Sequence, residues 1–275
     1  MPITTLSNVT AFNAQRHLTD TQRAHEKALA QLASGRRITK AGDDAAGLAI
    51  SNNLRARIGS VGQAVRNSED AFSLLQVAGQ GMSEISDILV RMRELATQSA
   101  TDTVGDSERE LIEIENVELQ AEIERIAQST KYLSSNLLNG EGDDFRFHIG
   151  ADNTEYDVIN YNGDGVDVTA GALGVDGLDL ADRDSAADSL ETIDTALKQL
   201  HVPMAQLGAL QTRMETTRDN LEVHQESLEA ANSRILDADY AKVSTDLARE
   251  SIKLQAGAAM VAQANQLPAL ALKLL

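Results

Sequence analysis

A heptad repeat constrains this chain of 275 residues more than any other feature. Between residues 188 and 235 an apolar residue recurs at every seventh position without interruption. The positions are Ile193, Leu200, Leu207, Met214, Leu221, Leu228 and Ile235. This period is typical of a coiled-coil seam. A continuous helix of this length spans roughly 70 Å, and so narrow a stripe is buried only when partner helices cover it.

The composition favours thin helical packing over a compact globule. Aromatic residues make up only 3% of the chain, and there are three prolines. Compact cores usually rely on aromatic bulk, whereas long helices require few prolines. We therefore expect a mainly α fold, an elongated antiparallel bundle or coiled coil of N- and C-terminal segments with a small β-hairpin region between them. Pro203 lies within the seam, so we expect a break or kink at residues 201–203.

Charge and cysteine content exclude several functional classes. The formal net charge is −18 and cysteine is absent. An acidic surface repels nucleic acid and anionic membranes, so we expect neither as a partner. No apolar run is long enough to span a membrane, and residues 1–16 lack the pattern of a classical signal peptide. Disulfides and thiol catalysis are excluded by the lack of cysteine.

Helical periodicity extends over most of the chain outside the middle. The pattern predicts helices over residues 2–33, 44–100, 107–130, 188–235 and 241–267. The first of these has a weak apolar stripe, so a flexible solvated arm remains an alternative there. Asp43 or Asp44 is a suitable N-cap for the second helix. The acidic pair beside Gly42 could also suggest a metal site, but too few ligands accompany it.

Residues 141–185 differ in kind from the rest. They hold twelve Asp or Glu and two Arg, and eight of the 18 glycines fall between 140 and 177. Apolar and polar residues alternate over 145–149 and again over 155–158, which predicts two strands. Asn162-Gly163 is a hairpin signal, and Val166 with Val168 suggests a third strand. The acidic spacing does not match a calcium loop, so we interpret the acidic residues as surface loops.

No catalytic or cofactor motif is present. The five histidines have no metal-binding spacing, and the chain has no phosphate-binding glycine loop or nucleophile motif. Long helices also provide few concave pockets. We expect neither a cofactor nor an enzymatic activity.

Several short motifs lie near the two ends of the chain. Residues 32–38 (LASGRRI) and 43–50 (DDAAGLAI) resemble the N-terminal signature of bacterial flagellin. Residues 233–241 (SRILDADYA), 255–257 (QAG) and 262–266 (AQANQ) resemble the C-terminal one, and 147–151 (FHIGA) is similar to a short strand motif of the family. The resemblance covers residues 1–150 and 186–275, with both ends in the expected order.

This resemblance implies a structural subunit that polymerises into the flagellar filament for motility. It implies an inner, D0-like domain of residues 1–43 and 236–275. A rod, D1-like domain would comprise 44–140 and 186–235, with 141–185 as its short β-rich acidic segment. Because 141–185 is short, we expect a minimal form with little or no outer domain.

The same resemblance implies partners and a location. The chain would be exported unfolded without a cleaved signal, to be extracellular in the filament, with an export chaperone binding residues 241–275. Other copies, cap proteins and junction proteins would be further partners. Packing of the inner tube would involve apolar residues of both ends, namely Leu6, Val9, Phe12, Leu247, Leu254, Val261, Leu274 and Leu275.

A host Toll-like receptor is also implied as a partner. Residues 89–95 (LVRMREL) are similar to the family's receptor-contact motif, so Arg91, Leu95 and Glu115 are the expected contacts. Val90 replaces a frequent Gln and departs from that motif. Equally, Leu95 could be a core residue and Arg91 a contact between subunits. Both descriptions can hold if the filament buries this face.

Two other functions remain open from the sequence. A hook–filament junction protein shares the paired-terminal design, although residues 43–50 and the AQANQ stretch favour flagellin. A secreted or adaptor coiled-coil protein that never polymerises is the alternative from a different class.

Overall fold

The structure is a computed structural model that describes residues 8–163 and 165–272. The chain divides into two compact units, and both α2 and α4 contribute residues to each of them. We call residues 1–58 with 226–275 the terminal unit, and residues 59–225 the central unit.

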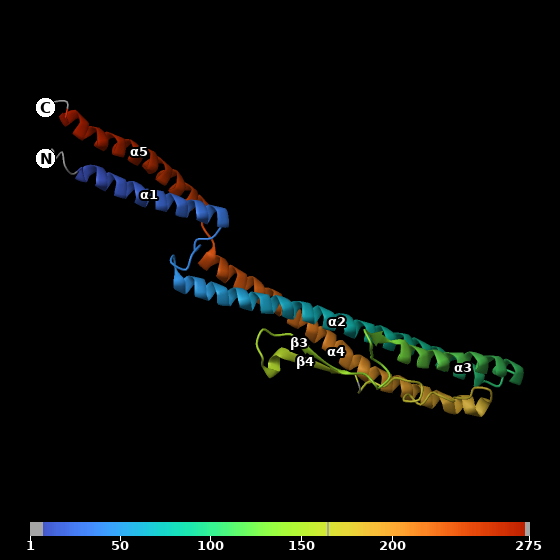
Figure 1. The fold of residues 1–275 in the computed structure, drawn as a ribbon. Helices are drawn as coiled ribbons and strands as arrows, with labels where there is room; N and C mark the ends of the chain where they lie inside the picture. The colour runs from blue at the N-terminus through green and yellow to red at the C-terminus, as the bar shows by residue number, and fades with distance from the viewer. Residues whose placement is uncertain (1–7, 164, 273–275) are drawn as a thin grey trace. The chain divides into compact units, whose positions relative to one another are not determined.

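Within the described residues, five α-helices account for most of the fold (Figure 1). They are α1 (Val9–Ser34), α2 (Ala45–Ser99), α3 (Asp106–Ser129), α4 (Arg183–Leu236) and α5 (Tyr240–Leu272). The short β1 (Lys131–Tyr132) pairs with β2 (Ser135–Asn136), and β3 (Asp144–His148) pairs with β4 (Val158–Asn162), both antiparallel. Helix makes up 73% of the structure, which confirms the mainly α class with paired terminal segments and a small hairpin.

In the central unit, α2 and α4 pack in antiparallel orientation. The Ser68 hydroxyl donates to the Met214 carbonyl at 3.2 Å, and Arg93 pairs with Asp194 at 2.7 Å. Residue numbers rise along α2 as they fall along α4, which defines the orientation. The seam forms because apolar side chains of both helices face each other. The most deeply buried on α2 include Leu74, Leu75, Met82, Ile85, Leu89 and Met92.

Helix α3 and the strand region cover the same core. Gly81 of α2 permits a close approach, because a Cβ there would come within 2.7 Å of Leu138 Cδ1. The acidic side chains of residues 141–185 are largely exposed, yet apolar side chains between them complete the core. These are Ile149, Ile159, Tyr161, Val166, Val168, Leu173, Val175 and Leu180. The segment is therefore a cover for the helices as well as a set of acidic loops.

The strand prediction was partly wrong. Residues 145–149 lie in or next to β3 as expected, but Glu155–Asp157 forms a 3-10 helix, η1, ahead of β4. The Thr154 hydroxyl and the Asp157 carboxylate form a capping box around that turn, which competes with extended structure. Val166 and Val168 are buried without forming a strand. Asn162 is the last residue of β4, so Asn162-Gly163 does not connect the hairpin strands.

The break predicted at residues 201–203 is absent, because helix α4 is continuous through Pro203. The last helix, predicted to end at residue 267, continues past Pro268 to Leu272. A helical proline removes one backbone hydrogen bond. At Pro203, burial of Leu200 at 0% and Leu207 at 5% exposure holds the helix on both sides of that missing bond.

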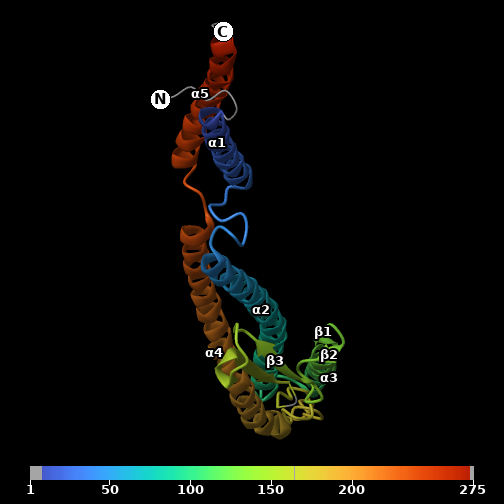
Figure 2. The same cartoon turned by 60° about the vertical axis from the view of Figure 1, so that its left-hand side comes forward.

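In the terminal unit, α1 and α5 lie side by side and antiparallel in both views (Figures 1 and 2). The Asn8 amide donates to the Ala264 carbonyl at 2.8 Å, and His25 contacts Ser251 at 3.1 Å. The N-terminal segment is thus helical from Val9 and is not a solvated arm. Gly35 ends α1 in a left-handed conformation with φ of 66°, as glycine does at many helix ends.

Candidate functional site

The paired end helices leave much of their apolar surface uncovered. Val9 is 60% and Phe12 67% exposed, although both were predicted to pack in an inner tube. Leu247, Leu254 and Val261 of α5 are half-buried. The other three candidates, Leu6, Leu274 and Leu275, lie outside the described residues. Two helices alone therefore leave these side chains without a closed core.

The heptad positions of α4 change in burial along the helix. Ile193, Leu200, Leu207 and Met214 are at most 5% exposed. The last three positions, Leu221, Leu228 and Ile235, are only half-buried. The heptad positions are therefore buried from Ile193 to Met214 and only partly buried from Leu221 onward.

The connection from α1 to α2 is held by polar contacts of the signature residues. Asp43 accepts hydrogen bonds from Thr39 and pairs with Lys27 at 2.7 Å. The contact with Lys27, then that with Thr39, holds the pKa of the Asp43 carboxyl well below its usual range. Asp44 is the N-cap of α2, because its carboxylate accepts from the Gly47 amide at 2.8 Å. The capping prediction is confirmed, and neither carboxylate is placed as a metal ligand.

The proposed receptor residues Arg91, Leu95 and Glu115 lie together. Arg91 of α2 pairs with Glu115 of α3 at 2.7 Å and with Glu94 at 3.1 Å. These carboxylates, Glu115 foremost, raise the pKa of the Arg91 guanidinium. Leu95 is 2% exposed and belongs to the core. All three line the floor or rim of an open depression of about 720 Å³ between α2 and α3.

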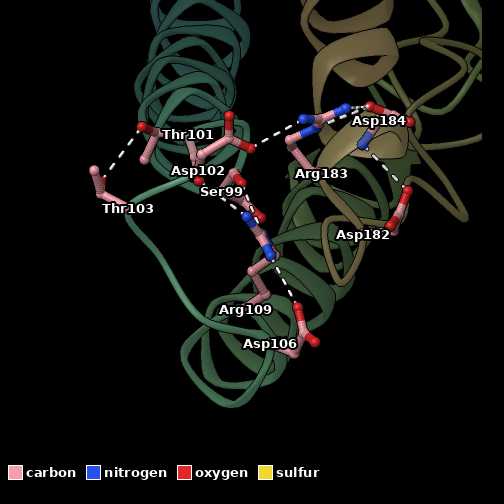
Figure 3. Close-up of polar contacts among 9 residues, drawn as sticks. All are labelled: Ser99, Thr101, Asp102, Thr103, Asp106, Arg109, Asp182, Arg183 and Asp184. Carbon is pink, nitrogen blue, oxygen red and sulfur yellow. Dashed lines mark hydrogen bonds and ion pairs between the residues drawn. The ribbon is translucent and has the colours of Figure 1, made fainter.

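At one end of the central unit, two arginines that the sequence did not single out connect the turn after α2 to neighbouring elements. Figure 3 shows Arg109 reaching from α3 to the carbonyls of Ser99 and Thr101, both at 2.9 Å. Ser99 is the last residue of α2 and Thr101 lies just beyond it, where carbonyls lack helical partners. Arg109 is only 7% exposed, and it also pairs with Asp106 at 3.0 Å. The i,i+3 spacing from Asp106 was its only sequence signal.

Arg183 makes the second connection. It pairs with Asp102 at 2.9 Å and with Asp184 at 2.7 Å (Figure 3), and these carboxylates raise the pKa of its guanidinium. The turn at residues 100–105 is thus tied to the starts of both α3 and α4. Because Thr103, Val104 and Gly105 line the depression, the two arginines fix part of its wall.

The described residues give no geometry for metal chemistry. Within residues 8–163 and 165–272, no three His, Cys, Asp or Glu side chains are grouped to hold a metal ion. Among the helices that the structure describes, none combines the length and apolarity needed to cross a membrane. The candidate sites are helical surfaces together with hydrogen bonds and ion pairs that connect neighbouring elements.

Comparison with known protein families identifies the family of this chain. The family model for the bacterial flagellin N-terminal helical region matches residues 6–143, and that for the C-terminal helical region matches residues 190–275. The chain belongs to the bacterial flagellin family. The resemblance seen in the sequence is therefore confirmed.

Individual relatives agree over nearly the whole chain. It is 40% identical to a flagellin of Halalkalibacterium halodurans, with 98% of each chain covered. It is 38% identical to the flagellar filament 33 kDa core protein of Treponema phagedenis, over 94% of this chain and 95% of that one. A crystal structure of Bacillus cereus flagellin matches with a TM-score of 0.52 at 28% identity, covering 57% of this chain and 88% of that chain.

Proposed function

We propose that this chain is a structural subunit that polymerises into the bacterial flagellar filament for motility. The observation that carries the proposal is the exposure of apolar side chains on α1 and α5, such as Phe12 at 67%, in a chain of the flagellin family. Neighbouring copies that cover these side chains gain hydrophobic stabilisation of about 25 cal/mol per Å² buried.

The mechanism is coupled ordering and assembly. Helices α1 and α5 pack on each other with a thin interface, so covering them by neighbours adds most to their stability. A head-to-tail contact that does not close produces an open helical array. Residues 1–43 and 236–275 form the inner domain of that array. Residues 44–140 and 186–235 form the rod, and 141–185 is its short β-rich acidic segment.

The role is structural and not catalytic, and the subunit is exported to the extracellular filament. Residues 241–275 bind the export chaperone before assembly, while cap and junction proteins contact the ends of the polymer. The uncovered apolar residues of α5, among them Ile252 at 68% and Met260 at 65% exposure, support a chaperone contact there.

Electron microscopy of the purified chain, concentrated with and without short filament seeds, tests the main proposal. We expect open-ended filaments whose length increases with time and protein concentration. A chain that stays dispersed in both conditions, or stops at a closed ring of few copies, would overturn the proposal.

The second role is recognition by a host Toll-like receptor through Arg91, Leu95 and Glu115. The clustering of these residues at one depression supports it. Replacing Arg91 and Glu115 together by Ala should abolish receptor signalling by the monomer. The pair Arg125→Ala and Glu122→Ala, an exposed ion pair on α3 outside that depression, is a matched control that should signal normally. Signalling that survives the first double substitution contradicts this role.

A further inference from the structure

A small pocket in the terminal unit is lined by two arginines. They belong neither to the heptad seam nor to the depression at Arg91. We call this small pocket the arginine pocket. It lies where the segment after α1, the first turns of α2 and the end of α4 meet, and its volume is about 120 Å³. Arg36 and Arg55 line it, together with Ser34, Thr39 and Ser51. Since a water molecule occupies about 30 Å³, the pocket has room for a carboxylate group with attendant water.

The walls of this pocket are built firmly. The Arg37 amide donates to the Leu236 carbonyl at 2.7 Å, and the Ala238 amide donates to the Gly35 carbonyl at 2.9 Å. The fully buried Ser51 hydroxyl donates to Asn232 at 2.7 Å. These contacts join α2 and the segment after α1 to the end of α4 and the residues that follow it. The position of the Arg36 backbone is therefore fixed by its neighbours.

The two guanidinium groups have no partner within the described part of the chain. No hydrogen bond or ion pair joins the side chain of Arg36 or Arg55 to another described residue, whereas Arg37 donates to the Ile235 carbonyl at 2.6 Å. Two carboxylates of the same segment are already engaged, because Asp43 pairs with Lys27 and Asp44 caps α2. Two unpaired cations at a preformed pocket favour an anion, and a guanidinium binds a carboxylate through two parallel hydrogen bonds.

The charge distribution of the chain indicates where that carboxylate comes from. The terminal unit carries 13 Lys or Arg and 10 Asp or Glu, a net charge of +3, whereas the central unit carries 11 and 32, a net charge of −21. In a polymer of identical chains, acidic central units are present at high local concentration. Contact between a cationic pocket and an acidic surface reduces the repulsion among them.

We propose that the arginine pocket accepts an Asp or Glu side chain from the central unit of a neighbouring copy. The inference rests on the proposed polymerisation. The pocket is then an electrostatic contact that complements the apolar contacts of α1 and α5. It selects a neighbour in a defined register, because only a carboxylate placed at the pocket pairs with both Arg36 and Arg55.

The first test compares the critical concentration for filament growth in two matched variants. Arg36→Gln with Arg55→Gln removes the pocket cations, and we expect the critical concentration to rise about tenfold at low salt. Lys40→Gln with Arg234→Gln removes the same charge from exposed positions of the same unit that do not line the pocket. This control should change the critical concentration by less than about twofold.

Raising the salt concentration should reduce the difference in critical concentration between the two variants, because salt screens charged contacts. Circular dichroism and thermal unfolding of the monomers control for folding, and both variants should match the unmodified chain. Equal critical concentrations for the two variants at low salt would overturn the inference and leave the proposed polymerisation intact. Failure of the unmodified chain to polymerise would instead overturn the proposed function.

The second test identifies the partner directly. Arg36→Lys places an amine in the pocket, and a carbodiimide then joins that amine to a contacting carboxylate as an amide. In filaments grown from mixed ¹⁴N and ¹⁵N chains, mass spectrometry should find residue 36 joined to an acidic residue of 59–225 in peptides of mixed label. Cross-links found only within one chain would overturn the inference. The inference would also be overturned if calorimetry showed that the monomer binds phosphate or acetate while the variant with Arg36→Gln and Arg55→Gln still polymerised normally.

Discussion

The two units of this chain are built from the same kind of helix, yet they bury very different amounts of apolar surface. In the central unit, side chains as large as Met82, Leu89 and Ile193 are completely buried. Among the described residues of the terminal unit, the least exposed apolar side chain is Ile38 at 3%, and Phe12 remains 67% exposed. The central unit closes its own core, and the terminal unit does not.

The difference comes from the number of layers. In the central unit α2 and α4 are covered further by α3 and by the segment of residues 141–180, so the stripe of each helix meets neighbours on more than one side. Helices α1 and α5 pack mainly on each other, and α1 is otherwise held by polar contacts with the segment that follows it, such as Lys27 with Asp43. A pair of helices buries one face of each, so its stability is small unless other chains supply the remaining contacts.

Removing the end helices is the strongest test of this contrast. We expect chains without residues 1–33 or without 241–275 to remain folded and soluble and to lose polymerisation completely. The free energy of unfolding of the central unit should change by less than about 1 kcal/mol, because its core lies outside the removed segments. Chemical denaturation and electron microscopy check the two parts. Filaments from either shortened chain would show that the ends are dispensable.

Matched leucine substitutions in the two units sharpen the contrast. Leu89→Ala, in the central core, should reduce the free energy of unfolding by about 2–5 kcal/mol, because it leaves a cavity. Leu254→Ala, on the half-buried α5, should reduce it in the monomer by less than about 1 kcal/mol, while raising the critical concentration for polymerisation. Denaturation of monomers and turbidity of growing filaments measure these effects. Equal losses in the monomer would mean that the end helices are as well packed as the core.

The buried hydroxyl of Tyr161 predicts a pH dependence confined to the central unit. Burial raises the pKa of Tyr161 to about 12, and the residue is 6% exposed. The unfolded chain loses this proton near pH 10 whereas the folded chain keeps it, so stability is complete below pH 10 and falls as pH rises towards 12. The loss is about 3 kcal/mol.

Tyr161→Phe is the control for that titration. Its free energy of unfolding at pH 7 should stay within about 1 kcal/mol of the unmodified chain, because the hydroxyl bond to the Leu137 carbonyl is long, at 3.5 Å. Denaturation curves at pH 8–12 give the difference between the two proteins. If the difference in free energy of unfolding did not change with pH, the Tyr161 phenol would not cause the loss of stability at high pH.

The smallest expected effect lies at the turn between β1 and β2. Leu133 has a φ of 55° and is 93% exposed, so its side chain does not offset the cost of the left-handed conformation. Asn tolerates this conformation better, and Leu133→Asn should stabilise the central unit by about 0.5–1 kcal/mol. Leu133→Ala keeps the unfavourable backbone and should give no gain in thermal unfolding. An equal gain from both would assign the effect to lost apolar exposure.

Local patterns predicted the fold well where one physical cause dominated. The heptad positions Ile193 to Met214 are buried, and the Asp44 cap is where its sequence neighbours indicated. Prediction failed where local and tertiary preferences competed. Pro203 stays helical because flanking seam residues hold it, and Asp157 draws residues 155–157 into a turn in place of a strand.

Among the candidate surfaces too, some features were predictable from local sequence and others depended on tertiary packing. The motif around Arg91 was recognisable from sequence, but its pairing with Glu115 across two helices was settled by packing. For Arg109 and the arginine pocket, nothing in the sequence indicated which groups the arginines would meet. Their roles depend on carbonyls and side chains that come together from separate elements, as at Ser99 and at Asn232.

The sequence by itself determined the helical class, the period of the seam, the family and the charge of each segment, because these follow from the order and chemistry of neighbouring residues. Only the tertiary structure decided which stripes close into a core and which stay open, and which arginines find partners. Those outcomes depend on distances between residues far apart in the chain. No local preference for helix or strand specifies such distances.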